Sequence, residues 1–219
     1  LGRLNDPARE VRSAALEALG QINDPRVAPA LMRQASEGPD EVRSQALLAL
    51  GQLGTPSAVP FLRQILMEGP DKLRGRAAQA LSLAGRNQAA LAPSIARDLV
   101  SLWARDELRP TIAEALLTLG EPAAPALAEL LPRPALLDVE GVVRLLGAIP
   151  QPGNVKPLLE ELERRRARPE LVIAALGKHL VGAELRVAPA LLGLLGSDDK
   201  ITRRAVMTAL AGRLDARAQ

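Results

Sequence analysis

A proline followed two residues later by leucine or isoleucine recurs along the whole chain at a nearly constant interval. Successive copies are separated by 31, 33, 32, 32 and 32 residues. The six prolines are Pro29, Pro60, Pro93, Pro125, Pro157 and Pro189. A period of this length predicts stacked structural repeats, each of which buries its apolar face against its neighbours.

Each repeat also carries a helical segment that opens with an aliphatic residue and arginine. This segment begins at Val11, Val42 and Leu73 in the first three copies and is looser in the later ones. In the first copy, EVRSAALEALG, apolar residues recur every three or four positions, which indicates a helix with one buried face. The repeating unit is therefore predicted to be a pair of helices.

Local signals mark where these helices begin and end. The proline should lie near the start of the first helix, where a missing N–H costs little. Asp24 and Thr55 are predicted to be N-caps of such helices. Four glycines are predicted to end the second helix, or to lie near its end, as left-handed residues. They are Gly20, Gly51, Gly120 and Gly147.

These signals predict an all-α fold, a right-handed α-solenoid (superhelix) of about six and a half two-helix repeats. The chain is expected to form a single repeat domain, residues 1–219. Its units are predicted at 1–23 (partial), 24–54, 55–86, 87–120, 121–150, 151–182 and 183–219. Because the first unit looks incomplete, we expect an uncapped N-terminal end that continues upstream or self-associates with another copy.

Composition excludes most catalytic classes. The chain has no cysteine, one histidine (His179) and 1% aromatic residues. Without a thiol or a second imidazole, we expect no metal site and no catalytic or cofactor-binding residues. The net charge of +3 is small and gives little support for a nucleic-acid partner. No apolar run approaches the ~20 residues of a membrane span, so we expect a soluble, cytoplasmic protein that does not bind membranes.

The repeats resemble HEAT repeats of the subtype called phycobilisome-lyase HEAT-like repeats. The resemblance covers essentially the whole chain and rests on the proline–leucine motif, an acid at the turn within each repeat, and the Val-Arg pair. The acids are Asp6, Glu37 and Glu68, and the arginines are Arg12, Arg43 and Arg74. The pattern loosens after about residue 100, where Trp103 stands in the place of the turn acid.

The resemblance implies roles for two groups of residues. The arginines, together with Arg109 and Arg203, are implied to hydrogen-bond the turn acids as a structural ladder; the alternative is a basic strip for phosphates. The second helix of each repeat is implied to line the concave surface, so its exposed positions are candidate protein-binding residues. They are Glu17, Gln21, Gln45, Leu48, Gln52, Arg76, Gln79, Leu83, Glu114, Thr118 and Arg144.

A dense charge cluster, EELERRRAR, begins at Glu160. The spacing predicts helix pairs Glu160–Arg164 and Glu161–Arg165, with an anion site at Arg164–Arg166 as the alternative.

Two unusual side chains have structural interpretations. Trp103 is expected to plug the core at the irregular repeat, with a binding hot spot as the alternative. His179 is expected to be a surface or capping residue, because no second metal ligand or base accompanies it.

The leading functional interpretation is a non-catalytic scaffold that binds a partner protein or peptide on the concave face, because that face is mostly neutral with small apolar side chains. One alternative is a bilin lyase-type subunit, since the resembling subtype includes enzymes that attach or detach tetrapyrroles on phycobiliproteins. Another is a HEAT-like DNA-binding or DNA glycosylase protein, which the scarcity of aromatics and clustered cations disfavours. HEAT-type iron hydroxylases use His-Glu pairs on successive repeats, and a single histidine excludes that arrangement.

Overall fold

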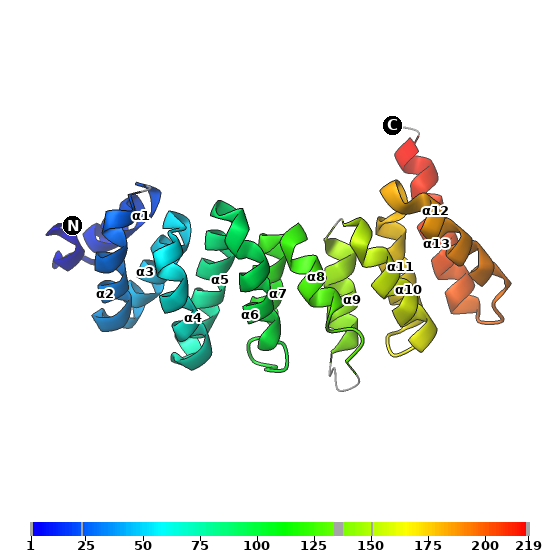
Figure 1. Cartoon of the computed structure of the whole chain (residues 1–219), viewed down its shortest axis with the longest axis horizontal. Coiled ribbons are helices and arrows are strands. Elements are labelled where there is room, and N and C mark those ends of the chain that lie inside the picture. Colours follow the sequence, from blue (N-terminus) through cyan, green and yellow to red (C-terminus); the bar gives the residue numbers. More distant parts are fainter. Residues whose placement is uncertain (1, 23, 134–137, 150, 218–219) are drawn as a thin grey trace. The chain divides into compact units, whose positions relative to one another are not determined.

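The computed structural model describes residues 2–22, 24–133, 138–149 and 151–217. The chain divides into two compact units, Leu1–Ala123 (unit 1) and Ala124–Gln219 (unit 2). All regular secondary structure in the described residues is α-helix or short 3-10 helix, as Figure 1 shows. The prediction of an all-α solenoid made of helix pairs is confirmed.

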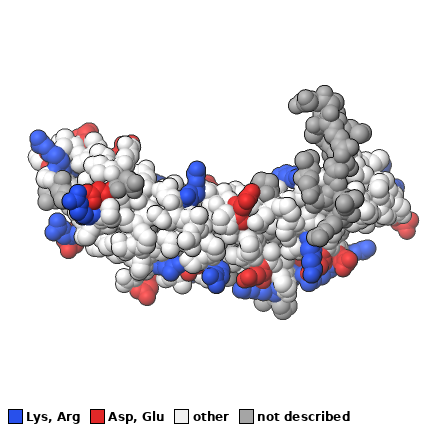
Figure 2. Space-filling model, turned by 45° about the horizontal axis from the view of Figure 1, so that its top comes forward, with Lys and Arg blue, Asp and Glu red and all other residues white. Residues whose placement is uncertain are grey.

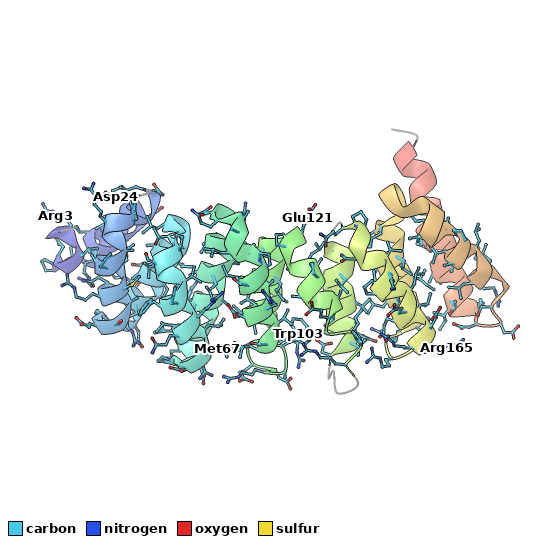
Figure 3. All side chains as sticks on the ribbon, viewed as in Figure 1. Arg3, Asp24, Met67, Trp103, Glu121 and Arg165 are labelled. Atoms are coloured by element: carbon cyan, nitrogen blue, oxygen red, sulfur yellow. The ribbon has the colours of Figure 1, made fainter. Side chains whose placement is uncertain are left out.

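Unit 1 contains two rows of helices. Its helices are η1 (Gly2–Asn5), α1 (Arg9–Gln21), η2 (Pro25–Val27), α2 (Ala28–Glu37), α3 (Asp40–Leu53), η3 (Pro56–Ala58), α4 (Val59–Glu68), α5 (Asp71–Asn87), η4 (Ala89–Leu91), α6 (Ala92–Ser101), α7 (Arg109–Leu119) and η5 (Glu121–Ala123). Helices α1, α3, α5 and α7 pack in sequence as the B row, and α2, α4 and α6 pack against them as the A row. Figure 3 places Asp24 and Glu121 at one edge of these rows, and Met67 and Trp103 at the opposite edge.

Unit 2 repeats the same plan. Its helices are α8 (Ala124–Ala128), α9 (Val139–Ala148), η6 (Pro152–Asn154), α10 (Val155–Arg164), α11 (Pro169–Lys178), α12 (Leu180–Gly193), η7 (Leu194–Gly196) and α13 (Lys200–Arg217). Helices α9, α11 and α13 pack in sequence, and α8, α10 and α12 pack against them.

The repeated prolines lie where the sequence predicts, with one exception. Pro29, Pro60 and Pro93 are the second residues of α2, α4 and α6, each of which follows a 3-10 turn. Their missing N–H groups lie in the first turn, which has no intrahelical acceptor. Pro189 is the exception, because α12 begins at Leu180 and the proline lies inside the helix.

Helix caps follow the prediction in part. Asp24 accepts a hydrogen bond from the Arg26 backbone N–H at 2.9 Å, as an N-cap should. Thr55 occupies the equivalent position before η3, but its side chain makes no capping hydrogen bond.

All four glycines lie at or near the end of a second helix, as predicted, but three of them are not left-handed. Only Gly120 ends a helix with a positive φ, of 74°. Gly20, Gly51 and Gly147 lie inside α1, α3 and α9, before the last residue of each. The left-handed residue that ends α3 is Gly54, with φ of 63°.

These internal glycines allow neighbouring B-row helices to approach closely. A Cβ added to Gly51 would lie 2.5 Å from the carbonyl oxygen of Ala80 on α5. Contacts of the same kind join glycine and alanine on three other pairs of successive second helices. They are Gly20 with Ala49, Gly147 with Ala175, and Gly177 with Ala209. A glycine is therefore needed at each of these four contacts, because the neighbouring helix occupies the space that a side chain would fill.

Trp103 lies in the core of unit 1, between α6 and α7 (Figure 3), as predicted for a plug. It is 3% exposed, and the Arg109 guanidinium lies 5.9 Å from its ring centroid. Its burial excludes the alternative of an exposed binding hot spot.

The charge cluster of unit 2 differs from the predicted pairing. Glu160 pairs with Arg164 at 3.2 Å, as expected. Glu161 is fully buried and pairs with Arg166 at 2.5 Å, not with Arg165. Helix α10 ends at Arg164 and Arg165 is left-handed (φ 56°), so the chain leaves the helix before Arg165 can face Glu161.

Arg166 also donates hydrogen bonds to backbone carbonyls. Its guanidinium donates to the carbonyl oxygens of Leu131 and Arg133, the latter at 3.0 Å. Glu161 accepts in addition from the backbone N–H groups of Arg166 and Ala167, at 3.2 and 3.3 Å. These contacts, here called the Arg166 clasp, occupy one of the three arginines of the alternative anion site, and Glu160 occupies a second, Arg164.

His179 is buried rather than at the surface, although it does occupy the C-cap position of α11. Its Nε2 lies 2.9 Å from the carbonyl oxygen of Leu146 on α9. A carbonyl oxygen only accepts, so Nε2 carries the proton. The buried Asn154 donates to the same oxygen at 3.0 Å. The imidazole therefore helps to tie α11 to the end of α9.

Candidate protein-binding face

The predicted binding residues of unit 1 lie in matching positions on successive B-row helices. Counted from the aliphatic residue of each Val-Arg-like pair, Gln21, Gln52 and Leu83 all stand ten residues on, in or at the last turns of α1, α3 and α5. Glu17, Leu48 and Gln79 stand six residues on. Because the helices pack side by side, equal positions form rows that cross the B row.

Exposure along these rows is uneven. Glu17, Gln21, Gln52, Arg76, Glu114 and Thr118 are exposed, whereas Gln45, Leu48, Gln79 and Leu83 are half-buried. Two of the amides are held by neighbours. Ser13 donates to Oε1 of Gln45 at 2.8 Å, and Arg76 donates to Oε1 of Gln79 at 3.0 Å.

Arg144, the remaining predicted residue, belongs to unit 2. It is exposed on α9 and pairs with Glu140 at 3.2 Å. Glu140 also accepts from Arg168, and this hydrogen bond lowers the pKa of Glu140 from its ordinary value.

A groove of about 710 Å³ opens at the end of the B row, where α1, α3 and α5 terminate. We call it the amide groove, because four primary amides line it. Its lining residues are Gly20, Gln21, Gln52, Leu53, Leu83, Arg86, Asn87 and Gln88. Its volume lies in the range of small-ligand and peptide pockets.

The groove exists because α5 is longer than its neighbours. Helix α5 has 17 residues, against 13 in α1 and 14 in α3. Its last residues, Arg86 and Asn87, form a wall beside the ends of the shorter helices. The wall is fixed by a hydrogen bond of 2.7 Å from Asn87 Nδ2 to the carbonyl oxygen of Gln52.

Five groove residues are absent from the set predicted by sequence: Gly20, Leu53, Arg86, Asn87 and Gln88. The last three of these residues line the groove because α5 continues to Asn87. The predicted repeat boundary after residue 86 placed Asn87 and Gln88 in the next repeat. No local residue type marks the difference: the equivalent positions 54 and 85 are both glycine, but Gly54 is left-handed and ends α3, whereas Gly85 remains helical.

The arginine ladder forms, but with different partners. Arg12 donates to the backbone carbonyls of Asp6 and Pro7 at 2.8 and 3.0 Å, and Arg43 donates to that of Ala35 at 3.1 Å. Arg109 and Arg203 likewise reach carbonyls six residues upstream. These carbonyls belong to turns and helix ends that lack intrahelical donors.

For Arg43, Arg74 and Arg109, the acid that pairs with the arginine lies three residues before it. Arg74 pairs with Asp71 at 2.9 Å and Arg43 with Asp40 at 3.7 Å. Glu37 and Glu68 are exposed and make no ion pair with any described residue. An acid on the same first turn of the helix is nearer than one at the end of the preceding helix, which corrects the predicted partners. With their donors engaged, these arginines do not form a free phosphate strip.

Charges elsewhere on the surface alternate in sign. On the face shown in Figure 2, basic and acidic side chains lie interspersed among uncharged residues. Asp24 and Arg26 are an example, paired at 2.7 Å, and this hydrogen bonding lowers the pKa of Asp24. A sequence-independent phosphate surface would need cations gathered without acids.

Metal-ligand clusters and membrane-spanning helices are both absent from the described part of the chain. No group of three or more His, Asp or Glu side chains there could hold a metal ion. No helix there is long and apolar enough to span a bilayer.

The outer side of α1 exposes apolar residues. Ile22 is 57% exposed, while Leu53, which stands in the same position of α3, is 4% exposed. Ala14 and Ala18 on α1 are exposed as well. In α3 the corresponding side packs against α1, so this side of α1 has the character of a helix-packing surface.

Comparison with known proteins agrees with this repeat geometry. Residues 1–82 match the family described as HEAT repeats. Residues 1–82 are therefore assigned to HEAT repeats. No curated protein sequence matches it.

Three solved structures are among those similar to this chain. Human deoxyhypusine hydroxylase is 22% identical, with 95% of this chain and 81% of that chain covered and a TM-score of 0.46. The complex of CpcE and CpcF of phycocyanin lyase from Nostoc sp. PCC7120 is 21% identical, with 96% and 92% covered and a TM-score of 0.48. An archaeal HEAT-like repeats protein from Thermococcus onnurineus NA1 is 18% identical, with 90% of each chain covered and a TM-score of 0.49. Values this low carry no function from those proteins to this one.

Proposed function

We propose that this protein is a non-catalytic scaffold that binds a protein or peptide partner on the exposed face of the B row in unit 1. The observation that supports the proposal is the amide groove, which brings the predicted Gln21, Gln52 and Leu83 together on one face. Primary amides donate and accept at once, as a peptide backbone does. Half-buried leucines beside them offer apolar contact without a large exposed patch.

Site-specific photo-crosslinking tests this proposal. A benzophenone amino acid replaces Gln52 on α3 or, as a matched control, the exposed Gln64 on α4 of the A row. In an extract of the source cells, we expect a discrete cross-linked protein from position 52 and none from position 64. Equal cross-linking from both positions would contradict the proposal.

A second variant distinguishes specific binding at the B-row face from nonspecific adsorption. Leu48→Glu with Leu83→Glu introduces charge on the B-row face and should abolish the cross-link at position 52. Circular dichroism checks that the variant keeps its helix content; if it unfolds, Gln21→Glu, at an exposed position, replaces it. A cross-link that survives in a folded variant places the partner elsewhere. A change in the spectrum of added bilin in the presence of acceptor protein would instead favour the lyase alternative.

We also propose that the apolar side of α1 mediates self-association. The support is the exposure of Ile22 at a position that is buried in α3. Analytical ultracentrifugation should show a concentration-dependent dimer that Ile22→Lys abolishes. Met67→Lys, a substitution at a 43% exposed position of α4, should leave it intact. A monomer at all concentrations overturns this proposal.

A further inference from the structure

The charge inside the amide groove indicates which peptides it accepts. Arg86 is the one charged side chain among the lining residues, and it is exposed. It makes no ion pair with any residue that the structure describes, in contrast to Arg74 on the same helix, which pairs with Asp71 at 2.9 Å. An unpaired guanidinium surrounded by amide N–H groups is a receptor for a carboxylate.

The helix ends around Arg86 do not cancel this preference. A helix C-terminus carries partial negative charge from its free carbonyls, and three helices end here. At α3, however, donors satisfy carbonyls of the last turn: Gly54 N–H bonds to Leu50, and Asn87 Nδ2 bonds to Gln52. Arg86 lies in the last turn of α5 and offsets that helix end itself. The formal charge of Arg86 therefore sets the sign of the groove.

The spacing of the groove matches an extended chain. Gln21, Gln52 and Leu83 hold the same position on adjacent helices, and packed helices lie about 8–10 Å apart. An extended peptide advances about 3.3 Å per residue, so about three residues bridge one helix to the next. The row from α1 to α5 is thus spanned by about six residues. A helical ligand, which rises about 1.5 Å per residue, presents no backbone groups to the amides.

We propose that the amide groove binds an extended peptide segment of about six residues that carries an acidic side chain. The peptide backbone bonds to the amides of Gln21 and Gln52. An aliphatic side chain packs on Leu83, and the carboxylate pairs with Arg86. This inference rests on the proposed scaffold function and specifies the partner chemistry for it.

Selection from a random hexapeptide library, with the full chain as bait, tests the inference. Sequences retained by the parent should be enriched at least about fivefold in Asp or Glu at one position. Arg86→Glu should reverse the preference, so that Lys or Arg is enriched instead. Retention of no peptides, or of peptides without acid enrichment, overturns the inference.

Lys72→Glu is the matched control. Lys72 is exposed at the start of α5, so it makes the same charge change on the same helix. It lies 14 residues from Arg86, or about 21 Å along the axis at 1.5 Å per residue. Its selected peptides should match those of the parent; a shift equal to that of Arg86→Glu would mean that only net charge is sensed.

The affinity of one selected acidic peptide completes the test. We expect Arg86→Glu to weaken binding about tenfold or more, since a hydrogen bond between charged groups contributes about that factor. We expect Gln52→Ala, which removes neutral hydrogen bonds to the peptide backbone, to weaken it about fivefold. Loss with Arg86→Glu alone would overturn the role of the amides. If the cross-link at position 52 forms but no acid preference appears, the scaffold proposal stands and this inference fails.

Discussion

A missing methyl group sets the distance between two helices of this protein. Gly51 on α3 lies against the backbone of Ala80, so that a Cβ there would come within 2.5 Å of a carbonyl oxygen. Backbone atoms cannot rotate away as the end of a side chain can. The glycine is therefore required by packing, although its own φ is ordinary.

Replacing Gly51 by alanine should destabilise the protein by about 1–3 kcal/mol, the range for overpacking a close-packed core. Gly75→Ala is the control, because its Cβ would meet only Thr111 of α7 at 3.4 Å. That change should be neutral or stabilise by up to about 1 kcal/mol through helix propensity. Urea unfolding measures both; an equal effect of the two changes would refute the packing argument.

At the scale of the element, where a helix stops decides which side chains can meet. Helix α10 stops at Arg164, which brings Arg166 rather than Arg165 to Glu161. Helix α5 continues to Asn87, which builds the wall of the amide groove. Sequence periodicity predicts that these helices exist, but their last residues depend on tertiary contacts such as the bond from Asn87 to Gln52.

The Arg166 clasp should contribute measurably to stability. Arg166→Ala leaves the buried Glu161 without its cation and two carbonyls without donors, so we expect a loss of about 2–3 kcal/mol. Arg165→Ala removes an exposed cation of the same cluster and should change stability by less than about 0.5 kcal/mol. Thermal and urea unfolding compare the two. The opposite order would restore the pairing that the sequence suggested.

The start of α13 should be sensitive to acid. Asp199 accepts from the backbone N–H groups of Ile201 and Thr202 at 3.1 and 2.9 Å, and from the Thr202 hydroxyl, which together lower the pKa of Asp199. A lowered folded-state pKa contributes stability above the ordinary pKa of the carboxyl, and this is lost as pH falls through the folded value. Asp199→Ala should therefore lower the midpoint of thermal unfolding at pH 7, and by less at pH 2. A difference independent of pH would contradict this role.

At the scale of the whole molecule, the sequence predicted the repeat plan because it repeats the same local signals. Pro29, Pro60 and Pro93 all sit in first helical turns, as their restricted φ demands. It did not predict the ladder partners. Arg43 and Arg109 donate hydrogen bonds to backbone carbonyl oxygens, which every residue type has, so no residue in the sequence marks them. The candidate face was predicted on α1, α3 and α5, but the residues of the α5 wall, Arg86 and Asn87, were not.

Stability should vary along the B row. In repeat proteins each unit is stabilised mainly by its neighbours, and α3 and α5 are packed on both sides while α1 is packed on one. Hydrogen exchange followed by mass spectrometry should show slower exchange in α3 and α5 than in α1. Equal protection of α1 would indicate that its exposed side is covered in solution. If self-association covers it, the same measurement on the Ile22→Lys variant should show faster exchange in α1.

The glycine–alanine contact has a consequence for how such a chain can be rebuilt. The same contact joins α1 to α3, α3 to α5, α9 to α11 and α11 to α13. The α5–α7 junction differs, because there Gly75 meets Thr111 and Gly85 meets Leu119. We expect repeats bounded by the shared contact to tolerate duplication or deletion, because the helices brought together would meet through the same glycine–alanine contact. A duplication or deletion at the α5–α7 junction would also require substitutions at the residues that form its different contacts.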